Sequence, residues 1–131
     1  MGEIKKVFKD KVVLVVDDEP EIVEIIADLL EDTLECKAHR ASDGLEALKL
    51  LESQKFDLVC SDLKMPVMDG AALVKALREG ESSNKDVGVL IISGYPDDSD
   101  RVLTRYEKVL ILDKPINEKR LVANASLFLQ L

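Results

Sequence analysis

Five short apolar runs alternate with segments in which apolar residues recur every three or four positions. The run at residues 12–16 is apolar throughout, as expected for a strand that is covered on both faces. Residues 22–30 carry apolar side chains at helical spacing instead. The pattern predicts strands at five ranges: 11–16, 36–41, 56–61, 87–92 and 109–112.

Residues that favour helix starts follow most of these runs. Pro20 suits the first turn of a helix, and Ser42 or Asp43 can cap the next one. Gly70 opens a third helical pattern, and Asn117 can cap the last helix. Each predicted strand is therefore followed by a predicted helix.

Strands that alternate with helices predict an α/β fold, a doubly wound parallel sheet of five strands with helices on both faces. Five helices are expected, and the one at residues 97–106 has the weakest signal because it carries few apolar residues. A chain of 131 residues suits one domain, so we expect a single domain over residues 1–131.

Polar residues stand where the strands end. Asp17 and Asp18 follow the first run, and Asp62 follows the third. Ser93 follows the fourth run, and Lys114 follows the fifth. Ligands bind at the carboxyl ends of the strands in an open parallel sheet, so we expect these side chains to converge at that edge.

This set of side chains suits phosphoryl transfer. Three nearby carboxylates repel one another unless a cation neutralises them, and Mg²⁺ prefers oxygen ligands. Asp17 and Asp18 suit the metal, and Asp62 is the best candidate for a nucleophile that forms an aspartyl phosphate. Lys114 and Ser93 can donate to phosphoryl oxygens. The alternative is that Asp62 is an ordinary turn or helix-capping residue.

Composition narrows the class of protein. Hydrophobic residues make up 47% of the chain, which argues against disorder, and the net charge is −8. An acidic surface repels phosphate backbones, so we expect no direct binding to DNA or RNA. No apolar run approaches the ~20 residues of a membrane helix, and the charged N-terminus lacks a signal-peptide core. We therefore expect no membrane contact and a cytoplasmic location.

Several motifs occur in order along the chain. They are Asp17-Asp18, Asp62 followed by Met65-Pro66 and Asp69-Gly70, Ser93-Gly94, Lys114-Pro115, and the stretch 41–48. With these motifs, residues 10–131 resemble the receiver domain of two-component response regulators, related to the chemotaxis response regulator. The resemblance implies a flavodoxin-like sheet with strand order 2-1-3-4-5 and a site between strands one and three.

The resemblance also implies roles for the acidic residues. Asp62 would be the phosphoacceptor. Asp18 and Asp62 would bind Mg²⁺ directly, with the backbone carbonyl of Lys64 as a third ligand. Asp17 would bind the ion through water.

The remaining site residues would respond to the phosphate. Ser93 and Lys114 would hold the phosphoryl oxygens, and Ser93 would also move toward the phosphate as a switch. Many family members carry an aromatic residue three positions before the lysine, and that position is Ile111 here. In the family, this aromatic residue swings inward when the switch hydroxyl moves. With Ile111 at that position this response is in doubt, and Tyr95 is a candidate substitute for the aromatic residue.

The resemblance further implies a signalling module rather than an enzyme, apart from catalysis of its own phosphorylation and dephosphorylation. The phosphate would come from a histidine of a sensor kinase or of a histidine phosphotransfer protein. An effector or a second copy of the chain are candidate partners. The alternatives are a pseudo-receiver that only binds proteins and a phosphatase or ATPase that uses an aspartyl phosphate. Whether the chain is a stand-alone regulator or part of a longer protein is left open.

The implied strand order also bears on the two cysteines, Cys36 and Cys60. Strands two and three would flank strand one, which separates the two residues by roughly 10 Å. A disulfide requires Cα atoms within ~7 Å, so we expect both cysteines to be free.

Overall fold

The computed structural model of the chain describes residues 7–94 and 100–131. Its five strands pair in parallel in the order β2-β1-β3-β4-β5. The strands are β1 (Val12–Val16), β2 (Lys37–Ala41), β3 (Leu58–Asp62), β4 (Gly88–Ser93) and β5 (Val109–Asp113). The predicted doubly wound parallel sheet and its strand order are confirmed.

Helices cover both faces of this sheet. The described residues contain four α-helices: α1 (Pro20–Leu34), α2 (Gly44–Ser53), α3 (Gly70–Glu79) and α4 (Glu118–Leu129). The expectation of a fifth α-helix is wrong, because residues 100–105 form the 3-10 helix η1 (Asp100–Arg105). Helix stability in proteins comes mostly from packing of an apolar face, and this segment has little apolar surface to pack. The expected helix also included residues 97–99, which lie outside the described residues.

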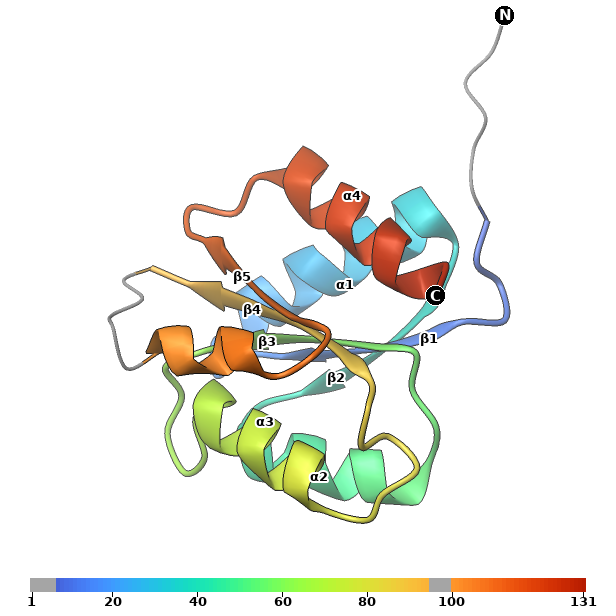
Figure 1. Cartoon of the computed structure of the whole chain (residues 1–131). Coiled ribbons are helices and arrows are strands. Elements are labelled where there is room, and N and C mark those ends of the chain that lie inside the picture. Colours follow the sequence, from blue (N-terminus) through green and yellow to red (C-terminus); the bar gives the residue numbers. More distant parts are fainter. Residues whose placement is uncertain (1–6, 95–99) are drawn as a thin grey trace, which may run out of the picture.

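The molecule has three layers (Figure 1). Helices α1 and α4 cover one face of the sheet, and α2, α3 and η1 cover the other. Val13 and Val15 of β1 pack in the core under α1 and α4. Leu14 and Val16 pack in the core under α2 and α3. This alternation explains why β1 is apolar at consecutive positions.

The helix starts follow the local sequence. Pro20 is the first residue of α1. Asp43 rather than Ser42 caps α2, because its side chain accepts a hydrogen bond from the backbone N–H of Glu46 at 2.8 Å. Glu46 accepts hydrogen bonds in return from the N–H and Oγ of Ser42. The side chain of Asn117 caps α4, as predicted.

Both cysteines are buried and free, as predicted. Burial raises the pKa of the Cys36 thiol to about 11 and that of Cys60 to about 12. Both thiols therefore stay protonated near neutral pH and serve as small core residues.

Within the described ranges, none of the helices is long and apolar enough to span a lipid bilayer.

Candidate functional site

The ends of the central strands align at one edge of the sheet. Asp62 of β3 pairs in register with Ile92 of β4, and Ser93 pairs with Asp113 of β5. Strands β3 and β4 each run one residue further than predicted, so Asp62 and Ser93 are the last residues of their strands. Lys114 follows β5 directly.

Three carboxylates meet at this edge. One oxygen each from Asp17, Asp18 and Asp62 lies within 4.8 Å of the other two. Asp17 and Asp62 are buried, whereas Asp18 is exposed. The structure thus brings together the three acidic residues that the sequence analysis selected.

The environment of Asp17 disfavours its charged form. Burial is the largest cause and raises the pKa of Asp17 to about 6, and the charges of Asp62 and Asp18 act in the same direction. The N–H of Glu19 donates to Asp17 Oδ1 at 2.9 Å and opposes this shift, as does the charge of Lys114. A cation at this position would favour the ionised carboxylate.

Asp62 is held by several neighbours. Lys114 Nζ donates to Asp62 Oδ1 at 3.2 Å, and the N–H of Leu63 donates to the same oxygen at 2.9 Å. The buried Oγ of Ser61 donates to the carbonyl of Asp62 at 2.9 Å. These contacts fix both the carboxylate and the backbone of Asp62.

Ser93 offers a hydroxyl that lacks a partner. The residue is 1% exposed, and its Oγ makes no hydrogen bond within the described part of the chain. Its backbone carbonyl accepts from the N–H of Lys114 at 2.8 Å, which places the two residues side by side. Buried polar atoms are nearly always bonded, so this hydroxyl is suited to a ligand.

Two glycines allow the loop after β3 to pack closely. A Cβ atom at Gly70 would lie 2.6 Å from the carbonyl oxygen of Asp62, and one at Gly44 would collide with the backbone of Met68. The start of α3 therefore packs against the phosphoacceptor candidate, and the start of α2 packs against the loop. The sequence analysis placed both glycines in motifs but missed these roles, which depend on contacts between distant segments.

The loop between β3 and α3 also contains a strained residue. Val67 has a φ of 69°, and its side chain is 78% exposed. Around it, the N–H of Met68 donates to the carbonyl of Pro66 at 2.8 Å, which closes a tight turn. Lys64 lies in the same loop with an exposed side chain, and the role of its carbonyl as a metal ligand stays a prediction.

Ile111 occupies the position, three residues before Lys114, at which many family members carry an aromatic residue, and it is not exposed. Ile111 on β5 is half-buried against the core under α2 and α3. Tyr95, its candidate substitute, lies outside the described residues.

Comparison with protein families supports the resemblance seen in the sequence. Residues 13–126 match the family described as response regulator receiver domain. The receiver domain of the Francisella response regulator 1452 aligns with a TM-score of 0.81 and 27% identity, over 92% of this chain and 97% of that one. The Vibrio cholerae chemotaxis protein CheY4 aligns with a TM-score of 0.79 and 28% identity, over 90% of this chain and 98% of that one.

Curated relatives are longer proteins. The sensor histidine kinase TmoS of Ectopseudomonas mendocina is 36% identical over 87% of this chain, which spans 12% of that kinase. The response regulator GtcR of Aneurinibacillus migulanus is 36% identical over 71% of this chain, which spans 36% of that regulator. By fold, by sequence and by the motifs at its strand ends, the chain belongs to the response regulator receiver domain family of two-component signalling.

Proposed function

We propose that this chain is a phosphorylation-dependent signalling module that accepts a phosphoryl group on Asp62. The observation that carries the proposal is the convergence of unlike groups at one sheet edge. They are the carboxylates of Asp17, Asp18 and Asp62, the ammonium of Lys114 and the hydroxyl of Ser93. This hydroxyl has no hydrogen-bond partner among the described residues. A nucleophile, cation ligands and donors to an anion are the groups that phosphoryl transfer needs.

The proposed step is transfer from a phosphohistidine of a sensor kinase or histidine phosphotransfer protein. A carboxylate oxygen of Asp62 attacks the phosphorus, and the new O–P bond forms as the N–P bond breaks. The electron pair of the N–P bond stays on the imidazole nitrogen, which takes up a proton from solvent. Lys114 and Ser93 donate to the phosphoryl oxygens and stabilise their charge.

The acidic cluster fits Mg²⁺. Opposite ligands in an octahedral Mg²⁺ site lie about 4.2 Å apart, and the three carboxylate oxygens lie within 4.8 Å of one another. Asp18 and Asp62 would bind the ion directly, the carbonyl of Lys64 would be a third ligand, and Asp17 would bind through water. When bound, Mg²⁺ supplies positive charge that neutralises these carboxylates and the transferred phosphoryl oxygens.

Phosphorylation would then change partner binding. The hydroxyl of Ser93 would turn toward the phosphoryl group on Asp62 and draw the end of β4 with it. An effector protein or a second copy of the chain is the proposed reader of this change. The likeness to a sensor histidine kinase and to a response regulator supports a donor of the same signalling class.

The test is intact mass spectrometry after incubation with Mg²⁺ and acetyl phosphate. We expect one phosphate adduct on the wild type and none on Asp62→Asn or without Mg²⁺. No adduct on the wild type would contradict the proposal and favour a module that only binds proteins. An adduct that survives in Asp62→Asn would mean that another residue is the acceptor.

A further inference from the structure

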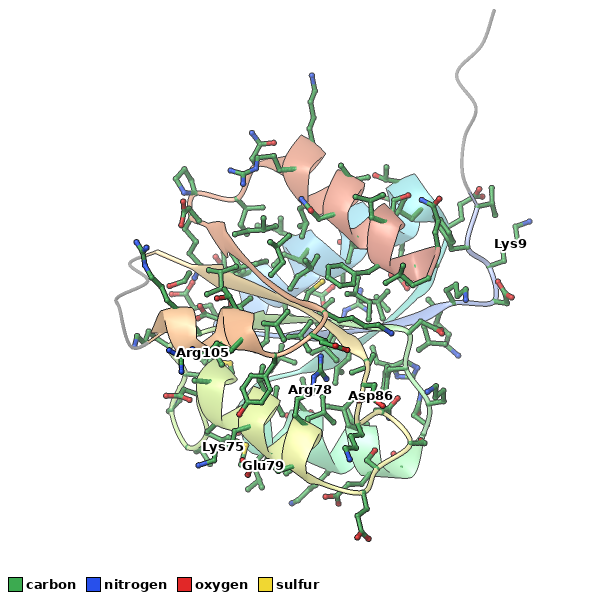
Figure 2. The ribbon with its side chains drawn as sticks, viewed as in Figure 1. Lys9, Lys75, Arg78, Glu79, Asp86 and Arg105 are labelled. Carbon is green, nitrogen blue, oxygen red and sulfur yellow. The ribbon has the colours of Figure 1, made fainter. Side chains whose placement is uncertain are left out.

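Arg78 is a half-buried arginine on α3 that binds three backbone carbonyls outside its own helix. Its Nη1 donates to the carbonyl of Lys85 at 2.8 Å. Its Nη2 donates to the carbonyls of Val87 at 2.7 Å and Glu107 at 2.9 Å. Lys85 and Val87 lead into β4, whereas Glu107 lies in the turn between η1 and β5. In Figure 2, Arg78 lies between α3 and these segments.

The contact uses the geometry of the arginine side chain. No carboxylate of the described residues forms an ion pair with Arg78, although the charge of Asp86 acts on it. Burial lowers the pKa of Arg78, and the charges of Asp86 and Tyr106 oppose this shift. A planar guanidinium carries donors on separate nitrogens at fixed angles, and Arg78 uses both Nη1 and Nη2, whereas the three donors of lysine share one nitrogen.

The turn that Arg78 holds has an open outer side. The turn, residues 106–108, borders a surface hollow of about 520 Å³. The hollow is lined by Arg78, Glu79, Asp86, Tyr106, Glu107 and Lys108. On its inner side, the N–H of Val89 donates to the carbonyl of Lys108 at 2.8 Å. Tyr106 packs against the core under α2 and α3, and the hydrogen bonds of Arg78 and Val89 hold the backbone of Glu107 and Lys108 beside it.

The opposite end of η1 lies on the side of the candidate site. Strand β4 ends at Ser93, and η1 follows in the chain after residues 95–99, which lie outside the described ranges. Ser93 therefore precedes η1 in the chain, and a phosphoryl group on Asp62 that attracts Ser93 Oγ pulls on the segment before this helix. Arg78 bonds to the segment after it, at the carbonyl of Glu107.

We propose that Arg78 is a positioning residue that fixes the turn after η1 as a hinge. Phosphorylation of Asp62 then displaces the N-terminal part of η1 and leaves the turn at residues 106–108 in place. The inference rests on the proposed function, because it requires a phosphoryl group on Asp62.

The test compares Arg78→Lys with the wild type and with Lys75→Ala, an exposed position on the same helix (Figure 2). Amide hydrogen exchange is measured with Mg²⁺, with and without beryllofluoride as a stable phosphoryl mimic. In the wild type and in Lys75→Ala, the mimic should change the exchange rates of the amides of residues 101–104. The exchange rates of the hinge amides of Val89 and Tyr106 should change by less than about twofold. In Arg78→Lys, the mimic should change the exchange rates of the two hinge amides by about tenfold or more.

The dependence on the mimic separates a hinge from simple loss of stability. Faster exchange by the same factor in both states would overturn the hinge and leave Arg78 a structural role only. Wild-type hinge amides that respond as strongly as residues 101–104 would also overturn it, even if Arg78→Lys did not fold. Intact mass after acetyl phosphate treatment is recorded for the same proteins. No adduct on the wild type would contradict the proposed function itself, whereas an adduct with unaltered hinge behaviour in Arg78→Lys would contradict only the hinge.

Discussion

Lys114 Nζ lies 3.2 Å from Asp62 Oδ1, so the candidate phosphoacceptor already has a cationic neighbour before any phosphate arrives. The same ammonium reduces the repulsion between the neighbouring carboxylates, because its charge also lowers the pKa of Asp17. On the proposed function, Lys114 would both donate to the phosphoryl group and compete with Mg²⁺ for the carboxylates. These two roles predict opposite effects of one substitution.

Lys114→Met should slow formation of the phosphate adduct by about 100-fold, because a donor to the phosphoryl charge is lost. The same change should strengthen Mg²⁺ binding, since a competing positive charge is removed from the carboxylate cluster. Intact-mass time courses and calorimetric Mg²⁺ titration measure the two effects. Weaker Mg²⁺ binding in Lys114→Met would show that the variant had damaged the site as a whole.

The raised pKa of Asp17 predicts how stability depends on pH. The native state holds the proton of this carboxyl up to about pH 6, whereas the unfolded chain releases it near the ordinary aspartate pKa of 3.8. Without Mg²⁺, the contribution of Asp17 to stability should therefore fall as the pH rises from about 4 to about 6. The shift corresponds to about 3 kcal/mol.

Asp17→Asn should remove this pH dependence. Compared with the wild type in urea unfolding, the variant should gain about 3 kcal/mol in relative stability between pH 3.5 and pH 7. Saturating Mg²⁺ should narrow the difference in stability at pH 7, because the ion should bind three carboxylates in the wild type more tightly than the two that remain in Asp17→Asn. A gap that is constant with pH would contradict the raised pKa.

Gly70→Ala should lower stability and slow adduct formation. In an ordinary helix the change to alanine is favourable by up to about 1 kcal/mol, but here the Cβ would lie 2.6 Å from the carbonyl of Asp62. We expect a net loss of about 1–3 kcal/mol in urea unfolding. The control is Ala72→Gly on the same helix, which should lose about 1 kcal/mol without altering the rate of adduct formation.

Val67→Asn should stabilise the protein. A β-branched residue at a φ of 69° is strained, whereas asparagine tolerates this backbone region. We expect a gain of about 1 kcal/mol in the free energy of unfolding, with an unchanged denaturant slope. Val67→Ala serves as the comparison, and an asparagine variant no more stable than the alanine variant would count against relief of strain.

Asn84 is fully buried and joins three segments near the other end of the sheet. Its Nδ2 donates to the carbonyls of Leu51 and Gln54 at 2.7 Å, and its Oδ1 accepts from the N–H of Phe56 at 2.7 Å. Asn84→Ala should cost about 2–4 kcal/mol in urea unfolding, because these buried groups lose their partner. Asn84→Asp should cost more, since it places a carboxylate against two carbonyls. Ser83→Ala, at an exposed neighbour, should stay within about 0.5 kcal/mol of the wild type.

The features that sequence could predict are those that depend on local pattern and on the rules of parallel sheets. The apolar run at residues 12–16 indicates a strand covered on both faces, and β1 is such a strand. Because parallel strands end at a common edge, the positions of Asp17, Asp62 and Lys114 after their strands were enough to predict that they meet. The register then places them within contact distance.

The features that sequence could not predict depend on contacts between distant segments. Strand β3 begins at Leu58 rather than at Phe56, because the N–H of Phe56 bonds to the side chain of Asn84 instead of a neighbouring strand. The three carbonyls bound by Arg78 and the burial that raises the pKa of Asp17 exist only once the layers have packed.

The contact between Asp62 and Lys114 spans 52 positions of the chain, and its lysine follows β5, the last strand of this sheet in chain order. The carboxylates leave the ribosome well before this lysine does, and early segments can begin to fold first. A nascent chain that has reached only β4 therefore contains the three aspartates without their ammonium partner. On the proposed function, such a chain lacks a donor to the phosphoryl group, so we expect it to accept phosphate more slowly than the completed domain.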